Sequence, residues 1–199
     1  WTDYGVLAGA VGLQDKFGSL IDMNYNGDIV AISSMTGIAT TYVYRHNGTS
    51  WNLDNNDIFA GYWKTQSLNK DGSIIAVTDY SSKVSIFKYN GTTWDKLGSD
   101  ISVNGNMVSL NDDGDIICIG KSDSNLSVYK YSTPGVITGS WQQLGSDVTG
   151  YNTSGWYRDS TDIGGSGYII ATRQSAGASV FRYSTPGSIG GTWVADTSS

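Results

Sequence analysis

Two aromatic pairs are the residues of this chain best suited to bind a ligand. They are Tyr62 with Trp63 and Trp156 with Tyr157, and Arg158 follows the second pair. Aromatic rings presented on loops stack on the apolar faces of sugars or pack against a protein partner. Both pairs fall in segments that vary between the units of an internal repeat, and such loops often carry binding residues. We therefore select these five as candidate ligand-binding residues; the alternative is that they cap the ends of the core.

Catalytic and metal-binding chemistry has little support in the sequence. All 18 acidic residues are Asp, and the chain has four Arg, one His and one Cys. Hydrolases that use a carboxylate pair, and metal sites that use Cys or His, need clusters that no motif marks here. The densest acidic run, 111–115, stands where the other units have a hairpin turn, so we interpret it as a turn rather than a calcium loop. We expect no enzyme activity, no metal and no cofactor.

The bulk composition excludes several other classes of protein. The 199 residues include 26 Gly and no Glu, which argues against a helical bundle because Gly, Asp, Asn and Ser favour turns over helix interiors. The net charge of −6 argues against a nucleic-acid partner. No apolar run reaches the roughly 18 residues that a membrane helix needs, so we expect no membrane insertion.

An internal repeat organises the elements that must position these residues. Trp recurs after a turn of small residues at Trp51, Trp94, Trp141 and Trp193, with a period of about 48 residues. Each unit also holds a Gly turn, then a nearly all-apolar stretch, then an alternating stretch. The apolar stretches are 28–33, 73–78, 115–120 and 168–173, and the alternating stretches are 41–46, 84–89, 126–131 and 178–183.

The repeat predicts an all-β fold. The apolar stretch is typical of a strand buried on both faces, the alternating one of a half-covered strand, and Asn-Gly and Asp-Gly of hairpin turns. With the Trp stretch as the outermost strand, each unit is a four-stranded antiparallel propeller blade. We predict a single β-propeller domain over 1–199, with approximate repeats 2–51, 52–94, 95–141 and 142–193.

Several conspicuous residues have structural interpretations once the units are aligned. The four repeated Trp side chains are expected to pack between blades, with a sugar-stacking row as the alternative. His46 stands where the other units have a Tyr, so we interpret it as a substitute for a structural aromatic residue. Cys118 stands where the other units have Ala, and we expect it to be buried and apolar.

The repeated motifs resemble a known family. The sequence LNKDGSIIAV at 68–77, followed by VSIFKY at 84–89 and NGTTWDKLGSDI at 90–101, is similar to the FG-GAP-like β-propeller repeats. The resemblance implies a place among surface and secreted proteins of marine microbes and viruses, with a distant relation to integrin α-subunit propellers. The full D-x-D-x-D-G calcium loop of the integrin type is missing, so calcium binding by that route is not expected.

Ring closure has three alternatives. Four units in near-integral phase favour a four-bladed ring, which leaves the Trp1 strand redundant. The chain can instead be a piece of a larger ring, or its terminal strands can complete a blade in another molecule. Because it begins with Trp1 and not Met, we expect a processed product or part of a longer protein.

These observations predict a non-enzymatic binding or adhesion module, placed outside a cell or on a virion surface, that takes a glycan or protein ligand on a loop face. The alternative is a structural or assembly subunit of a filament, fibre or virion surface layer, which self-associates through rim loops or terminal strands. The sequons at Asn47 and Asn90 lie in the Trp hairpins and are candidate glycosylation sites in a eukaryotic secretory setting.

Overall fold

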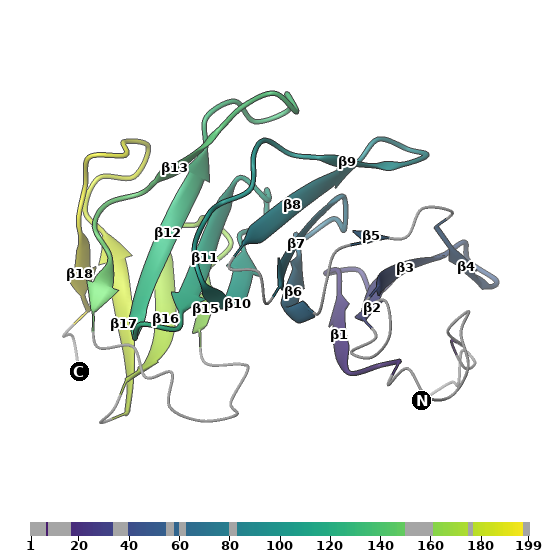
Figure 1. Ribbon diagram of the computed structural model, residues 1–199, viewed down its shortest axis with the longest axis horizontal. Coiled ribbons are helices and arrows are strands. Elements are labelled where there is room, and N and C mark those ends of the chain that lie inside the picture. Colours follow the sequence, from purple (N-terminus) through teal and green to yellow (C-terminus); the bar gives the residue numbers. More distant parts are fainter. Residues whose placement is uncertain are drawn as a thin grey trace.

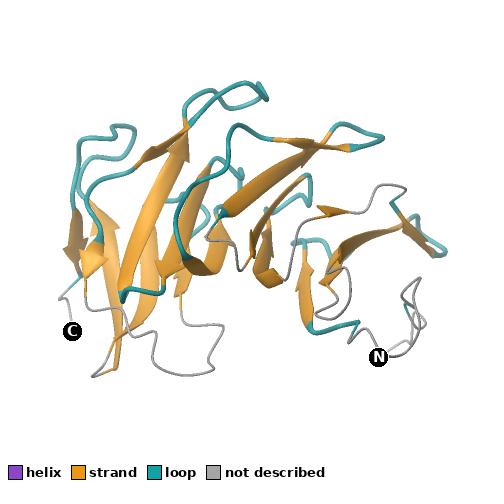
Figure 2. Ribbon diagram, in the orientation of Figure 1, coloured by secondary structure: helices purple, strands orange, loops and turns teal. Residues whose placement is uncertain are grey.

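The computed structural model describes residues 7, 17–33, 40–54, 58–59, 63–79, 83–149, 161–174 and 177–196. Every structural statement below refers to these residues. They form 18 strands, which hydrogen-bond into four antiparallel sheets (Figures 1 and 2). The expectation of an all-β propeller fold with four-stranded antiparallel blades is confirmed.

We call the four sheets blades 1 to 4, in chain order. Blade 1 contains β1 (Leu20–Met23), β2 (Ile29–Ser33), β3 (Thr40–His46), β4 (Trp51–Leu53) and β5 (Ile58–Phe59). Blade 2 contains β6 (Trp63–Leu68), β7 (Ile74–Asp79), β8 (Val84–Tyr89) and β9 (Trp94–Lys96). Blade 3 contains β10 (Gly105–Leu110), β11 (Ile116–Lys121), β12 (Asn125–Tyr131), β13 (Trp141–Gln143) and β14 (Val148–Thr149). Blade 4 contains β15 (Thr161–Ile163), β16 (Ile169–Gln174), β17 (Gly177–Tyr183) and β18 (Trp193–Ala195).

The turn between the first two strands of a blade is built by its Asn and Gly. In blade 3 the Oδ1 of buried Asn111 accepts a hydrogen bond from the N–H of Ile116 at 2.9 Å, and its Nδ2 donates to Asp115 Oδ1 at 2.9 Å. Gly114 has a φ of 70°, a left-handed conformation that costs a residue with a Cβ more than it costs Gly. The run 111–115 is therefore a hairpin turn, as its sequence predicts.

The outermost strand of a blade begins at the repeated Trp and is interrupted after a few residues. In blade 2, Trp94 pairs with Tyr89, and the chain then bends through 97–100. It returns to the same neighbour at Ile101, which forms a bridge with Val84. In blades 1 and 3 the returning segments are β5 and β14, which pair with β3 and β12. The sequence pattern did not predict this second segment.

The hydrophobic core lies between adjacent blades and is repeated at each junction. Ala76 and Ile86 of blade 2 belong to one cluster with Val108 and Ile117 of blade 3. Similar clusters join blade 1 to blade 2 and blade 3 to blade 4. Blades 2 and 3 therefore each contribute one apolar face to the blade before them and the opposite face to the blade after them.

The four blades form an open arc (Figure 1). Their innermost strands β1, β6, β10 and β15 follow one another in chain order, with blade 1 at one end of the arc and blade 4 at the other. The described strands show no closed ring, so the favoured four-bladed ring is not observed. An open arc is the geometry that a part of a larger ring would have.

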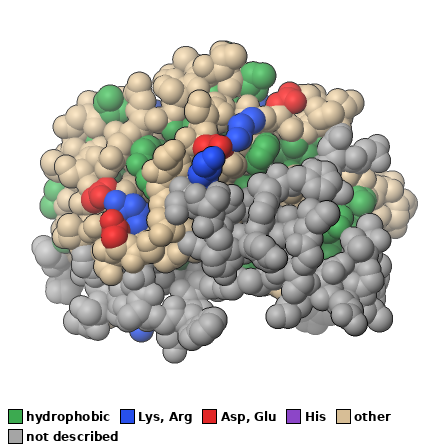
Figure 3. All heavy atoms as spheres, viewed as in Figure 1, with side chains coloured by type: hydrophobic (Ala, Val, Ile, Leu, Met, Phe, Trp, Pro, Cys, Tyr) green, Lys and Arg blue, Asp and Glu red, His purple; other side chains and the backbone are tan. Residues whose placement is uncertain are grey.

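Charged side chains on the described surface form mixed pairs. Figure 3 shows acidic and basic groups beside one another on one face of the molecule, separated by uncharged surface. Pairs include Lys96 with Asp100 at 2.5 Å and Lys70 with Asp112 at 2.7 Å. Within the described ranges, no helix has the length and apolar character needed to cross a lipid bilayer.

Candidate functional site

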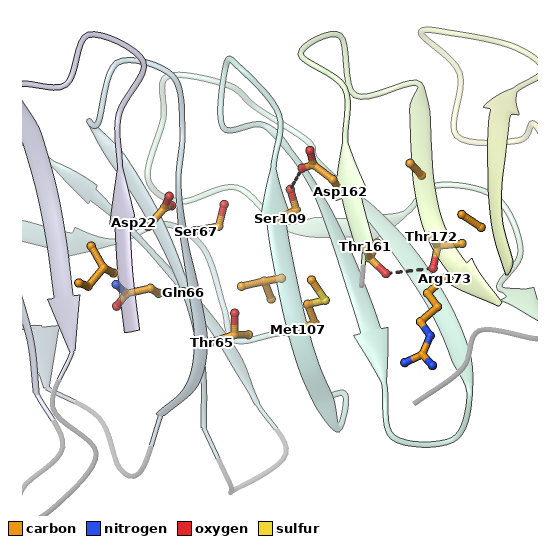
Figure 4. A pocket seen from close by; sticks show the side chains of 14 residues that line it. Asp22, Thr65, Gln66, Ser67, Met107, Ser109, Thr161, Asp162, Thr172 and Arg173 are labelled. Atoms are coloured by element: carbon orange, nitrogen blue, oxygen red, sulfur yellow. Dashed lines mark hydrogen bonds between the residues drawn. The ribbon is translucent and has the colours of Figure 1, made fainter. Parts of the chain in front are cut away.

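A row of polar side chains follows the concave side of the arc. One position on each innermost strand carries a short polar side chain, three residues before the turn residue whose backbone takes part in the hydrogen bonds between blades. These residues are Asp22, Ser67, Ser109 and Asp162. Figure 4 shows them at one level across the four strands. The strands bring together residues that are about 40 to 50 positions apart in the sequence.

The row binds each blade to the next through side-chain to backbone hydrogen bonds. The acceptor is the side chain of a row residue in one blade. The donor lies in the next blade and is the backbone N–H of the residue directly after that blade's own row residue. The bonds are Leu68 N to Asp22 Oδ2 (2.5 Å), Leu110 N to Ser67 Oγ (3.0 Å) and Ile163 N to Ser109 Oγ (3.4 Å). In this way, a backbone N–H of an innermost strand that faces no neighbouring strand still has a hydrogen-bond acceptor.

The ends of the row are carboxylates. Burial raises the pKa of Asp22; hydrogen bonds from the N–H groups of Leu68 and Met23 act against this, and the negative charge of Asp162 raises the pKa further. Asp162 Oδ1 accepts from Ser109 Oγ at 2.7 Å and from the N–H of Ile163 at 2.9 Å. The Oδ2 of Asp162 has no hydrogen-bond partner among the described residues.

A cavity of about 840 Å³ opens along this row. Its lining also includes Thr65, Gln66, Thr161 and Arg173, which lie at a second level below the row in Figure 4. Gln66 is committed to the fold, because its Nε2 donates to the carbonyl of Ala31 at 2.8 Å. Carboxylate, hydroxyl and guanidinium groups thus share one concave surface with a few apolar side chains.

These groups can form several hydrogen bonds to a polar ligand. Carboxylates and hydroxyls accept or donate to hydroxyl groups, and Arg173 offers a planar set of donors. Among the described residues, no group of three or more His, Cys, Asp or Glu could hold a metal ion. The chemistry available on this surface is recognition by hydrogen bonding.

A second acidic group has the opposite pKa shift. Asp147, on the segment before β14, is partly buried, which acts to raise its pKa. Hydrogen bonds from Lys121 and from Ser127 Oγ, the latter at 2.6 Å, outweigh burial, so the pKa is lowered below its ordinary 3.8. Asp147 therefore ties the resumed outer segment of blade 3 to the rest of the sheet.

The structure bears on only one of the five aromatic and Arg candidates. Tyr62, Trp156, Tyr157 and Arg158 lie outside the described residues. Trp63 is the first residue of β6, paired with Asp79, so its backbone belongs to an innermost strand and not to the preceding loop. The side chain of Trp63 also lies outside what is described, and the five residues stay a prediction.

The two sequon asparagines lie where the sequence predicts them. Asn47 and Asn90 are exposed in the hairpins that precede Trp51 and Trp94. The Oδ1 of Asn47 accepts from the N–H of Thr49 at 3.0 Å. Asn90 forms the same local turn with Thr92, at 2.9 Å. Their exposure is compatible with a glycan, and glycosylation itself stays a prediction.

Three of the repeated Trp residues, Trp94, Trp141 and Trp193, pack between blades, as predicted, whereas Trp51 packs within blade 1 and lines an apolar groove. The Nε1 of Trp141 donates to the carbonyl of Leu97 in the preceding blade at 2.9 Å, and the Nε1 of Trp193 donates to that of Leu144 at 2.8 Å. The ring of Trp141 lies 5.0 Å from that of Tyr131.

The remaining structural interpretations are also confirmed. His46 takes the place of the Tyr, with its ring 5.1 Å from that of Trp51. Cys118 is fully buried between blades 3 and 4, and burial raises the pKa of its thiol well above its ordinary value.

The polar row was missed by sequence reasoning, although a signal for it was present. Once the units are aligned on their Gly turns, Asp, Ser, Ser and Asp share one position before each turn. These residue types are common in turns and edges, so the position drew no attention. Its importance depends on the neighbouring blade, which a single unit does not contain.

Comparisons with known proteins show the fold alone. No family model matches the chain, and no curated protein matches it. Solved structures that resemble it include a proposed 6-phosphogluconolactonase from Bacteroides uniformis (TM-score 0.64, 10% identity, 89% of this chain and 53% of that one). A second is Hsv2 of Kluyveromyces lactis (TM-score 0.63, 10% identity, 91% of this chain and 61% of that one). A third is Sqt1 of Saccharomyces cerevisiae (TM-score 0.58, 12% identity, 84% of this chain and 46% of that one).

These three similar proteins are β-propellers, which agrees with the blades described above. The chain spans about half the length of each similar structure. At 10–12% identity, the likeness carries no information on ligand, activity or location in the cell.

Proposed function

We propose that this chain is a non-enzymatic β-propeller module that binds a carbohydrate along the concave side of its arc. The observation that carries the proposal is the cavity of about 840 Å³, lined by Asp22, Ser67, Ser109, Asp162 and Arg173. Its volume lies in the roughly 300–1,000 Å³ range of small-molecule sites. A sugar presents many hydroxyl groups, and the cavity offers both acceptors and donors for them.

The setting of this module is also a proposal. We place it at a cell or virion surface, as a member of the FG-GAP-like repeats, because of the repeated motifs and of a composition poor in charge and rich in Gly, Ser, Thr and Asn. Absence of catalysis is inferred from the missing Glu and the single His, a substitute for a structural Tyr. A protein ligand at the aromatic pairs is a further possibility for the same module.

A glycan array probed with the intact chain tests the proposal, followed by calorimetric titration of the best ligand. The variant Thr65→Val removes a hydroxyl from the cavity and keeps the side-chain shape. We expect it to weaken binding about 3- to 10-fold, the loss of one neutral hydrogen bond. Thr133→Val, at an exposed position in a rim loop, is the matched control and should bind like the parent.

Two results would contradict the proposal. One is an array without any bound sugar at millimolar concentrations. The other is a sugar whose affinity is the same for the parent and for Thr65→Val, because such a ligand would sit elsewhere on the molecule.

A structural or assembly function is the second candidate. The specific observation in its favour is that the end face of blade 4 is exposed, although the same face is buried in blades 1, 2 and 3. This candidate does not depend on the carbohydrate site.

A further inference from the structure

The three junctions between blades are built from the same contacts. At each one, the turn after the innermost strand donates a backbone hydrogen bond to the corresponding turn of the next blade. The bonds are Tyr25 N to Lys70 O (3.0 Å), Lys70 N to Asp112 O (3.2 Å) and Asp112 N to Gly165 O (3.1 Å). The side-chain row described above adds one further hydrogen bond at each junction.

The turn Gly of each blade also fits against an Ile of the preceding blade. A Cβ added to Gly72 would lie 2.7 Å from Ile29 Cδ1, and one added to Gly114 would lie 2.8 Å from Ile74 Cδ1. Gly167 meets Ile116 in the same way at 2.5 Å. The face of a blade that receives the next blade therefore has a fixed pattern of aliphatic side chains, which repeats from blade to blade.

Blade 4 carries this pattern on a face that no described residue of another blade covers. Ala171 is exposed, whereas the equivalent Ala31, Ala76 and Cys118 are fully buried. Val180 is 38% exposed, whereas the equivalent Val128 is buried at 1%. In sequence and shape this is a blade-facing surface, so its exposure marks a place where a further blade fits.

Asp162 indicates the same place. Asp22 uses Oδ1 for the N–H of Met23 in its own strand and Oδ2 for the N–H of Leu68 in the next blade. Asp162 repeats the first bond, with Ile163 as donor, while its Oδ2 has no partner among the described residues. The second oxygen is thus positioned for a backbone donor beyond blade 4.

Blade 1 carries the complementary surface at the other end of the arc. Ile21 is 64% exposed and Met23 is 52% exposed, although their equivalents Val108 and Leu110 in blade 3 are buried against blade 2. With Leu7, Phe17 and Trp51 they line an apolar groove of about 460 Å³. A Cβ added to the turn residue Gly27 would meet only Met23 Sδ of its own blade, at 3.5 Å, where Gly72 and Gly114 meet an Ile of the preceding blade.

We propose that two copies of this chain associate head to tail, with blade 4 of each packed against blade 1 of the other. Ala171 and Val180 then cover Ile21 and Met23 of the partner subunit, and Ile169 meets Gly27 of the partner subunit. Asp162 Oδ2 accepts the N–H of Met23 of the partner subunit. The inference rests on the assembly function, the second candidate above.

The charged residues at the two ends agree with this pairing. At the junction of blades 1 and 2, Arg45 pairs with Asp54 at 3.0 Å and lies 4.1 Å from the centre of the Tyr89 ring. In blade 4, Arg182 pairs with Asp196 at 2.5 Å, in the corresponding positions. In the dimer, Arg182 lies over the rings of His46 and Trp51 of the partner subunit, as cation–π contacts favour.

Arg173 is a second long side chain on the receiving face, in addition to Arg182, at a position where blades 1 and 2 have Ser33 and Thr78. Its stem can lie over Ile21 of the partner subunit while its guanidinium reaches into the cavity that it already lines. A long basic side chain in this orientation covers apolar surface and remains solvated.

Two arcs of four blades make an eight-bladed ring. Each interface is heterologous, and because the second interface is identical to the first, the assembly closes with twofold symmetry. The similar propeller chains are about twice as long as the part that this chain matches, so a ring of about this size is compatible with the blade geometry.

Light scattering coupled to size exclusion tests the proposal on the intact chain. The parent should elute with twice its chain mass of 21.3 kDa. Ala171→Arg on blade 4 and Ile21→Lys on blade 1 should each leave a monomer, since an unpaired charge at the interface weakens association on the order of 100-fold or more. Val136→Lys, an exposed apolar position at 52% on a rim loop, is the matched control and should stay dimeric.

Mixing the two interface variants separates a head-to-tail pair from any other dimer. A heterodimer of Ala171→Arg with Ile21→Lys has one junction that carries both substitutions and one that carries neither. Dimer should therefore reappear in the mixture, with a weaker association constant than the parent. Circular dichroism of each variant, which should match the parent, shows that the exposed substitutions leave the blades folded.

Three outcomes would overturn the inference. The first is a parent that is still monomeric at about 100 µM, a concentration well above the dissociation constant of a stable dimer. This result would mean that Phe17 and Leu7 already cover the exposed face of blade 1. A mass above the dimer means an open chain of copies instead of a ring. The third is a dimer that only one of the two interface variants abolishes and that does not reappear when the two variants are mixed. This result would mean that the two copies pair through the same face. Ile21 and Ala171 also line the cavity, so carbohydrate binding is tested separately on the array, with the parent and Thr65→Val, and not with the interface variants.

Discussion

The repeated Trp offers a matched pair of positions that isolates one hydrogen bond between blades. Trp141 and Trp94 occupy equivalent sites, half-buried, and each stacks on the Tyr that pairs with it, with ring centres 5.0 and 5.3 Å apart. The Nε1 of Trp141 donates to Leu97 O at 2.9 Å, whereas the Nε1 of Trp94 is buried without a partner among the described residues. The pair thus differs chiefly in this bond; Trp94 in addition has Arg45 Cζ 5.8 Å from its ring centre.

The substitution Trp→Phe at each position should therefore have unequal costs. Both changes remove a similar ring area, and this loss cancels in the comparison. Trp141→Phe also removes a hydrogen bond with a net worth of about 1 kcal/mol and strands the carbonyl of Leu97. Trp94→Phe removes an N–H whose burial already costs about 1–3 kcal/mol. We expect Trp141→Phe to be the less stable variant by at least ~2 kcal/mol.

Thermal and urea unfolding, followed by far-ultraviolet circular dichroism at one protein concentration, measure this difference. A gap of ~2 kcal/mol corresponds to about 4–8 °C in a chain of this size. Trp193→Phe repeats the test, because its Nε1 donates to Leu144 O at 2.8 Å, and should resemble Trp141→Phe. Equal midpoints for Trp141→Phe and Trp94→Phe would refute the assignment of the bond as the element that joins the blades.

Four further changes probe the turns and the acidic groups. Gly114→Ala places a Cβ 2.8 Å from an Ile of the preceding blade and at a φ of 70°, so urea unfolding should show a loss of about 2–4 kcal/mol. Gly27→Ala has similar backbone strain but only an ordinary contact, 3.5 Å from Met23 Sδ, and should cost about 1 kcal/mol. Equal losses would exclude the steric contact. Asn111→Ala removes the buried acceptor of its hairpin and should cost about 1–3 kcal/mol by the same assay, unless the turn forms without its side chain. The lowered pKa of Asp147 contributes stability at pH values above its ordinary pKa of 3.8, and this contribution is lost as pH falls through the folded pKa. In Asp147→Asn the free energy of unfolding should therefore fall less steeply at acid pH. The raised pKa of Asp22 has the opposite effect on stability. Its contribution to stability is present below 3.8 and is lost as pH rises through the folded pKa, so Asp22→Asn should remove that loss. A stability–pH curve that is unchanged in either variant would contradict the pKa shift assigned to that residue.

The blades could be predicted from the sequence because their determinants are local. The Gly turn, the apolar stretch and the alternating stretch of each unit lie within about 25 residues, and each pattern has one backbone solution. The interrupted outer strand was not predictable in this way. Its second segment, as at Ile101, depends on a bend whose sequence, LGSD, reads only as a loop.

The candidate site was predictable only in part for a related reason. Aromatic residues such as Trp63 attract attention as binding groups wherever they occur. The residues of the cavity, Ser67 and Ser109 among them, gain their importance from four strands placed side by side, and a Ser before a turn has no distinctive pattern in any one unit. Alignment of the units on the Gly turn reveals them, because equivalent positions in a ring face the same axis.

Ring closure was the least predictable feature, since a repeat specifies how one blade meets the next but not where the series stops. Each junction of this chain uses the same turn Gly and the same aliphatic face, and Gly27 and Ala171 extend that pattern to both ends. A sequence under no demand for a further neighbour would be expected to lose Ala171 and Val180 to polar residues, because exposed apolar faces promote association. Their retention beside Arg182 and Asp196, which reproduce the ion pair of the first junction, therefore favours an arc that is completed by another blade over one that stands alone.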